Sequence, residues 1–143
     1  MRTMPSPQNM EFIITEDRLK EPAEFLKSLL PLNKGAVCLH GEMGAGKTTF
    51  VRTFVGLFDI RDNVNSPSFS LLNIYGNGRI HHFDLYRLRS VQEVEDLGFS
   101  EIWESDTVSL IEWPERAEFL IPEKAVHLEF THISPRKRKI LFK

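Results

Sequence analysis

The stretch at residues 41–48 constrains this chain more than any other, because it fits a known pattern at each fixed position. It reads Gly-Glu-Met-Gly-Ala-Gly-Lys-Thr, which matches G-x-x-x-x-G-K-[ST]. Glycines let the backbone turn tightly and direct several N–H groups at one anion. The ammonium of Lys47 can reach outer phosphates, and the Thr48 hydroxyl suits the Mg²⁺ that accompanies them. We therefore predict a loop that binds nucleotide phosphates through Glu42, Met43, Gly44, Ala45, Gly46, Lys47, Thr48 and Thr49.

The flanking sequence supports this prediction. Residues 36–40 form a short apolar run that is typical of a buried strand. After the loop, apolar residues recur with the spacing of one helix face: Phe50, Val51, Phe54, Val55 and Phe58. A strand, a glycine-rich loop and a helix in that order place the phosphates at the helix N-terminus, which favours anions. A turn that binds nothing would account for the glycines but not for Lys47 and Thr48.

Length and composition predict a globular cytoplasmic protein. The 143 residues predict one domain over residues 10–143, after a flexible tail at residues 1–9. A formal net charge of −2 argues against wholesale electrostatic binding to nucleic acid. Cys38 is the only cysteine, so we expect a small buried hydrophobe in a reducing compartment. No signal peptide is evident, and no apolar run approaches the roughly 20 residues that span a bilayer.

The remaining periodicities predict a layered α/β domain. We expect a strand at residues 11–15, a helix from about Pro22, and a hairpin of residues 69–75 and 79–84 around a Gly-Asn-Gly turn. Ser90 and Glu93 have the spacing of a helix-capping box. Further strands are expected at residues 108–112, 125–130 and 139–142, with a short helix at 115–120 between them. The predicted fold class is a three-layer P-loop nucleotide-binding fold with a mixed, mainly parallel central sheet and a local β-hairpin.

Two acidic residues follow predicted strands, where a nucleotide hydrolase needs a carboxylate to hold Mg²⁺. Glu112 ends a mostly apolar strand, so we assign it to the metal together with Thr48. Asp84 ends a more polar segment and becomes the second acid, which orients the attacking water or a metal-bound water. With Lys47, these two acids are the expected catalytic residues. The alternative is that each acid caps a turn or pairs with Arg87 or Arg116.

Several other polar features allow two readings. Ser66 and Ser68 flank a proline, so this loop either senses the terminal phosphate as a switch or only shapes a turn. The histidines show no metal-ligand spacing, and we expect them to be structural or surface residues, with His82 on the Asp84 side of its strand. Trp113 is expected in the core. The basic run at residues 136–139 is expected to be a solvated strand edge, with an RNA contact as the less favoured alternative.

Four segments together resemble the TsaE family, at residues 41–50, 66–69, 82–87 and 111–115, and the likeness extends from about residue 11 to the C-terminus. The last two read His-Phe-Asp-Leu-Tyr-Arg and Ile-Glu-Trp-Pro-Glu and are far more specific than the loop. The resemblance implies a P-loop ATPase that uses ATP and Mg²⁺ and acts with TsaB and TsaD to install threonylcarbamoyl on a tRNA adenosine. It implies weak hydrolysis in isolation, and any tRNA contact is expected to be indirect. Two positions depart from the family: Ser68 replaces a usual Thr, and Leu19 stands where a base-contacting Thr is common.

Three other functions are alternatives to a partner-dependent ATPase. A small-molecule P-loop kinase needs an arginine-bearing lid, and no insertion of that kind is present. A switch GTPase needs a guanine-reading Asn-Lys-x-Asp motif, which is absent. A non-enzymatic nucleotide-gated binding module, in which ATP only orders residues 66–69, stays open as an alternative.

Overall fold

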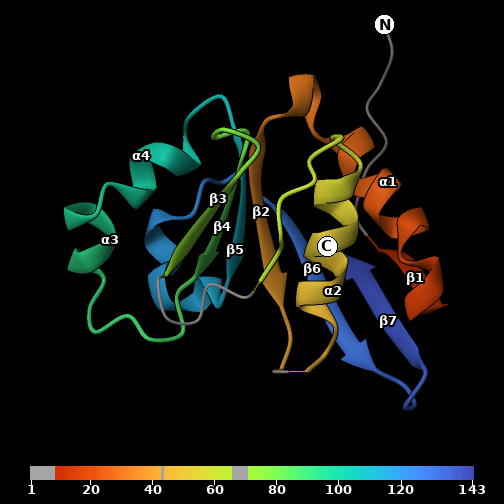
Figure 1. The fold of residues 1–143 in the computed structure, drawn as a ribbon. Coiled ribbons are helices and arrows are strands. Elements are labelled where there is room, and N and C mark those ends of the chain that lie inside the picture. Colours follow the sequence, from red (N-terminus) through yellow and green to blue (C-terminus); the bar gives the residue numbers. More distant parts are fainter. Residues whose placement is uncertain (1–8, 43, 66–70) are drawn as a thin grey trace, which may run out of the picture.

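The computed structural model describes residues 9–42, 44–65 and 71–143, and the chain folds around one seven-stranded sheet (Figure 1). The strand order is β1-β7-β6-β2-β5-β4-β3. The central strands β6, β2, β5 and β4 run parallel, whereas β1, β7 and β6 are antiparallel neighbours and β3 pairs antiparallel with β4. The strands are β1 (Met10–Thr15), β2 (Gly35–His40), β3 (Leu72–Tyr75), β4 (Ile80–Asp84), β5 (Val108–Glu112), β6 (Val126–His132) and β7 (Lys137–Phe142).

Helices cover both faces of the sheet and form the outer layers. One face carries α1 (Lys20–Leu29) and α2 (Lys47–Gly56), and the other carries α3 (Gln92–Asp96), α4 (Phe99–Trp103) and the 3-10 helix η3 (Pro114–Leu120) (Figure 1). Two shorter 3-10 helices, η1 (Glu16–Arg18) and η2 (Pro31–Asn33), flank α1. Every residue of β5 is buried, as expected for a strand packed on both sides. The predicted three-layer fold with a mixed sheet and a local hairpin is confirmed.

The apolar stripes of the two longest helices form the larger half of the core. Phe50, Val51 and Phe54 of α2 are completely buried, as the spacing after the loop predicted. Cys38 is also completely buried, and burial raises the pKa of its thiol to about 12, so it behaves as the predicted small hydrophobe. In the described ranges, no helix is both long and apolar enough to cross a membrane. Apart from Asn9, the predicted tail lies outside the described residues.

The start of α3 differs from the prediction. The helix begins at Gln92 with Val91 as its N-cap residue, and no side chain caps it. The Glu93 carboxylate does accept hydrogen bonds from the N–H groups of Arg89 and Ser90. Only one half of the expected capping box is therefore formed, and the prediction that the Ser90 side chain caps this helix is wrong.

The basic run at residues 136–139 does not form a sheet edge, so that prediction is wrong. β7 lies between β1 and β6, where Arg138 is in register with Ile14 on one side and His132 on the other. Because strand side chains alternate, Arg138 shares a face with the buried Ile140. The Arg138 side chain is only 11% exposed and therefore lies inside the fold, on the side of α1 and α2.

Candidate functional site

The loop of residues 41–46 connects β2 to α2 and has a backbone that suits glycine. Gly41, Gly44 and Gly46 have φ angles of 142°, 79° and 94°. A Cβ atom at Gly41 would lie 2.8 Å from the carbonyl oxygen of Phe130, so the loop also passes tightly over β6. Among the described residues, no side chain caps the first turn of α2. Its N–H groups and the positive end of the helix dipole are therefore available to an anion.

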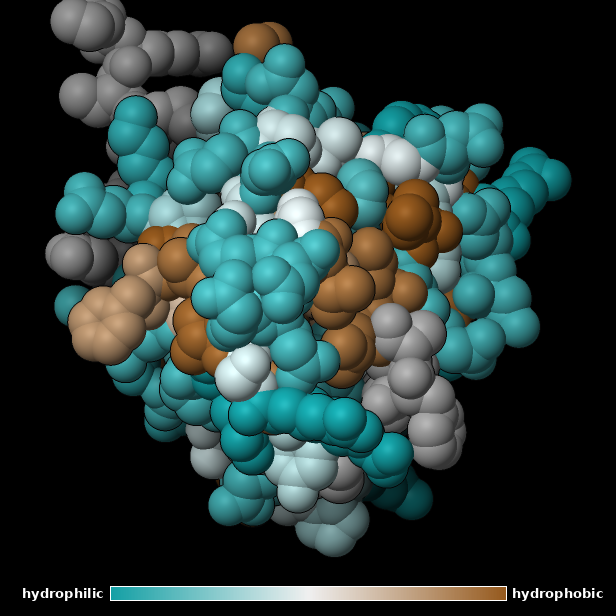
Figure 2. Space-filling view, turned by 90° about the vertical axis from the view of Figure 1, so that its left-hand side faces the viewer, coloured by the Kyte–Doolittle hydropathy of each residue, from teal (hydrophilic) through white to brown (hydrophobic). Residues whose placement is uncertain are grey.

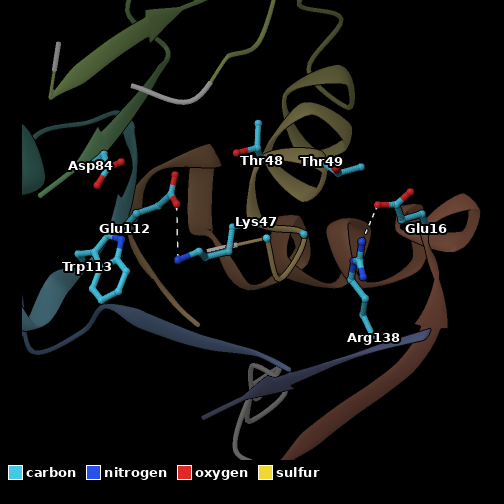
Figure 3. Close-up of a pocket in the computed structure, with 10 residues that line it drawn as sticks. Glu16, Lys47, Thr48, Thr49, Asp84, Glu112, Trp113 and Arg138 are labelled. Atoms are coloured by element: carbon cyan, nitrogen blue, oxygen red, sulfur yellow. Dashed lines mark hydrogen bonds and ion pairs between the residues drawn. The ribbon is translucent and has the colours of Figure 1, made fainter. Parts of the chain in front are cut away.

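A pocket of about 420 Å³ opens over this loop (Figure 3). The predicted residues that line it are Gly44, Gly46, Lys47, Thr48, Thr49, Asp84 and Glu112. Three lining residues were not predicted: Glu16, Trp113 and Arg138. Of the other predicted residues, Glu42 is exposed and Ala45 is buried, and neither lines the pocket. Met43, Ser66 and Ser68 lie outside the described residues.

Lys47 is the cation at the floor of the pocket, and it is only 6% exposed. Its Nζ atom donates a hydrogen bond of 2.5 Å to the Gly41 carbonyl and lies 3.7 Å from Oε1 of Glu112. The same atom lies 5.1 Å from the ring centroid of Trp113, which is within cation–π range. Trp113 is therefore partly a pocket wall rather than purely a core residue. A buried ammonium held in this way can bind an anion that enters the pocket.

The two predicted acids stand side by side. Asp84 on β4 and Glu112 on β5 are direct partners in the parallel register, and both are at least nine-tenths buried. Oδ1 of Asp84 accepts a hydrogen bond of 3.0 Å from the Tyr86 N–H. Burial raises the pKa of Asp84, and the neighbouring charge of Glu112 acts in the same direction, against that hydrogen bond. The sheet thus places two carboxylates beside the phosphate loop, at the carboxyl ends of parallel strands.

His82 holds one of these acids and is a feature that sequence reasoning underestimated. The side chain is completely buried, and Nε2 lies 2.6 Å from Oε2 of Glu112. The Oε1 atom of the same carboxylate faces Lys47 (Figure 3), so both oxygens of Glu112 have partners. The strand alternation already placed His82 on the Asp84 side. The strand order, which brings β4 next to β5, was needed to show that it meets Glu112.

At the opposite end of the pocket, Arg138 links β7 to the loop. Its Nη2 atom donates a hydrogen bond of 2.7 Å to Oε1 of Glu16 (Figure 3). Its Nη1 atom lies 3.2 Å from Nδ1 of His132, whose Nε2 lies 2.6 Å from the Gly44 carbonyl. Because a guanidinium can only donate, Nδ1 is the acceptor and Nε2–H donates to Gly44. The alternation of residues 136–142 could have placed Arg138 on the core face, but the antiparallel pairing with β1 that brings Glu16 close could not be predicted.

The oxygen atoms in the pocket fit Mg²⁺ that arrives with a nucleotide. Thr48 supplies a hydroxyl, and Asp84 and Glu112 supply carboxylates. Among the described residues, no group of three or more His, Cys, Asp or Glu side chains is placed to hold a metal ion by itself. Mg²⁺ characteristically uses one or two carboxylates and completes its octahedron with water and substrate phosphates. The described part of the pocket therefore has the donors for a shared magnesium site but not those for an all-protein cage.

Comparisons with known proteins show which family and which fold this chain resembles. A family model described as "Threonylcarbamoyl adenosine biosynthesis protein TsaE" matches residues 13–140. The chain is 38% identical over 106 residues to the tRNA threonylcarbamoyladenosine biosynthesis protein TsaE of Haemophilus influenzae, covering 73% of this chain and 67% of that protein. It is 36% identical over 132 residues to the protein of the same description from Rickettsia felis, covering 90% and 76%. The crystal structure of Bacillus subtilis YdiB shares the fold, with a TM-score of 0.76 and 24% identity over 94% of this chain and 84% of that one.

Proposed function

This chain belongs to the TsaE family of tRNA threonylcarbamoyladenosine biosynthesis proteins, and we propose that it is a Mg²⁺-dependent ATPase that works with TsaB and TsaD. One observation carries the proposal. One pocket is lined by the glycine loop that leads into the N-terminus of α2, by the buried ammonium of Lys47 and by two neighbouring carboxylates. Phosphoryl transfer relies mainly on positioning and on charge neutralisation, and these groups supply both.

Binding begins at the loop and the start of α2. The N–H groups of the loop and first helical turn surround the phosphates, and the dipole of α2 favours their negative charge. Lys47 exchanges part of its contact with Glu112 for the outer phosphates, since its Nζ lies 3.7 Å from that carboxylate. The Gly41 carbonyl keeps the ammonium at the floor of the pocket during this exchange. Arg138 and Glu16 bound the far end.

Hydrolysis places different demands on the two acids. Bound Mg²⁺ would neutralise charge on the phosphates, and Thr48 and Glu112 would hold it. Glu112 keeps its orientation because His82 fixes its other oxygen. Asp84, whose own orientation is set by the Tyr86 N–H, orients the attacking water or a metal-bound water. Burial raises the pKa of Asp84, and a more basic carboxylate is a better acceptor of a water proton.

The proposal is tested by steady-state ATP hydrolysis in a reconstituted mixture of this chain with TsaB and TsaD. Lys47→Ala should lose most of the partner-stimulated rate, because it removes the buried cation. Arg52→Ala is the matched control, because Arg52 is an exposed cation on the same helix and does not line the pocket. Glu112→Gln should retain ATP binding and lose hydrolysis.

The outcomes separate this proposal from its rivals. If Lys47→Ala hydrolyses ATP in the mixture as fast as the unmodified chain, the proposed site is wrong. If Glu112→Gln sustains tRNA modification as well as the unmodified chain does, nucleotide gating without hydrolysis is favoured. Transfer of phosphate to a small acceptor instead of water would indicate a kinase.

A further inference from the structure

A second hollow, of about 300 Å³, lies beside η3, and the proposed ATPase mechanism does not use it. We call it the η3 groove. Its walls come from η3, from the residues that follow η3, and from β2 and β6, which contribute His40 and His127. Apolar lining is supplied by Pro114, Ile121 and Pro122. The groove therefore has the apolar surface that a protein side chain can cover.

The η3 groove has a strongly negative rim. Glu115, Glu118 and Glu123 line it and are exposed. None of the ion pairs found in the described ranges involves any of these three carboxylates. Burial lowers the pKa values of His40 and His127, which favours their neutral forms, so these imidazoles are poor counter-charges for the rim. A Lys or Arg side chain with its aliphatic stem has the complementary chemistry.

A large apolar side chain stands on the same helix. Phe119 is 99% exposed, whereas Ala117, on the same helix, is 1% exposed and packs into the core. Burying a phenylalanine side chain yields about 2 kcal/mol. Figure 2 shows the side of the molecule that carries α3 and α4, where apolar groups also lie within a largely hydrophilic surface, and this region supplies the control positions used below. Phe119 does not line the groove itself, but it directly follows Glu118 of the rim. An exposed aromatic side chain beside carboxylates that form no ion pair within the described ranges can act as an interface anchor.

Residues of the groove are close in sequence to two parts of the proposed site, the phosphate loop and the acid Glu112. His40 immediately precedes Gly41, the first residue of the phosphate loop. Pro114 follows Trp113, which follows Glu112. A molecule seated in the groove therefore contacts residues one or two positions from the loop and from the acid. A molecule that restrains these positions would also restrain the loop that precedes Lys47 and the strand end that carries Glu112.

We propose that the η3 groove and Phe119 form the docking surface for a protein partner that presents a Lys or Arg side chain beside an apolar recess. Through this surface the partner positions the phosphate loop and Glu112, and so controls hydrolysis. The inference rests on the proposed function for its link to ATP turnover. A protein fits the surface better than RNA does, because the carboxylates of the rim repel a phosphate backbone.

The test uses two surface variants and two matched controls. Phe119→Ala removes the apolar anchor and Glu118→Lys reverses one charge of the rim. Leu97→Ala and Glu101→Lys make the same changes at exposed positions of the α3 and α4 region, away from the groove. The full-length chain, labelled with a fluorophore, is titrated with the TsaB–TsaD pair in the presence of Mg²⁺ and ATP, at low and high salt. ATP affinity of each chain alone is measured in parallel.

We expect each groove variant to weaken partner binding by about 10-fold or more, which is the usual effect of losing an interface anchor. Glu118→Lys should also reduce the dependence of affinity on salt. ATP affinity of the isolated variants, and partner binding by both controls, should be unchanged, because the altered residues do not line the nucleotide pocket.

Other results overturn the inference in distinguishable ways. If the groove variants bind the pair as tightly as the unmodified chain does, the inferred docking surface is wrong and the proposed function is unaffected. If the unmodified chain does not bind the pair, both the docking surface and the proposed action with TsaB and TsaD are wrong. If purified tRNA binds the unmodified chain and Phe119→Ala abolishes that binding, the occupant is RNA and the assignment to a protein is wrong.

Discussion

Replacing His82 by Phe tests how much the site depends on a residue that does not line the pocket but is hydrogen-bonded to Glu112. His82 is completely buried, and Nε2 lies 2.6 Å from Oε2 of Glu112. Its Nδ1 atom is buried and has no hydrogen-bond partner within the part of the chain that the structure describes. The substitution keeps a ring of similar shape and therefore removes one hydrogen bond, to a charged group, and little else.

The size of the effect follows from that hydrogen bond. A hydrogen bond to a charged group contributes about 1.5–3 kcal/mol, and the buried oxygen of Glu112 would be left without its donor. For a chain of this length, a loss of about 2 kcal/mol corresponds to a fall in Tm of about 4–8 °C. Because Glu112 also loses its fixed orientation, we expect kcat in the partner mixture to fall about 10-fold to 100-fold.

The assay combines thermal unfolding with ATP hydrolysis in the presence of TsaB and TsaD. His81→Phe is the matched control: His81 directly precedes His82 in β4, faces the other side of the sheet and is only half-buried. Its Tm should change by no more than about 1–2 °C. His82→Gln, which retains an N–H donor, should recover much of kcat. A His82→Phe chain with an unchanged Tm and unchanged kcat would show that the hydrogen bond to Glu112 does nothing.

Three further outcomes can be checked on the isolated chain. Cys38, fully buried with a pKa of about 12, should react with a thiol reagent only after denaturation, so fast labelling of the native chain would contradict its burial. Burial lowers the pKa values of His40 and His127 below the usual 6.5, so the unfolded chain binds these protons first and the free energy of unfolding should fall as pH drops through 6.5. Urea titrations should show a shallower fall when both are replaced by Gln. Gly41→Ala should cost about 1–3 kcal/mol, because its Cβ would lie 2.8 Å from a backbone oxygen, and more than Gly78→Ala, where the added atom meets open space.

Local sequence patterns predicted the central strands well, because these strands are buried on both faces and their apolar runs are visible in the sequence. The apolar runs that became β2 and β5 are buried on both faces, so nearly every side chain carries the information. The sheet margins were harder. The basic run that became part of β7 has a composition typical of an edge strand, yet β1, from the other end of the chain, pairs with it. Such a pairing joins segments far apart in sequence, and no local pattern encodes it.

The residues of the candidate site also differ in whether local sequence patterns could identify them. Lys47, Thr48, Asp84 and Glu112 could be found because phosphate and magnesium chemistry require those residue types at those places. Arg138 could not, because it reaches the loop only through the β1–β7 pairing and the hydrogen bonds of its guanidinium. The family resemblance predicted from the four sequence segments is confirmed, but the comparisons do not test the role of any single residue.

Calorimetry on the isolated chain tests the claim that the glycine loop, Lys47 and the neighbouring oxygen donors bind a magnesium triphosphate. Titration of the intact chain with MgATP should give saturable heat at one site per chain. The affinity should fall at least about 10-fold in Lys47→Ala, in line with loss of a charge-assisted contact, and should fall when Mg²⁺ is chelated. No heat with the intact chain, or an affinity that Lys47→Ala leaves unchanged, would contradict the claim.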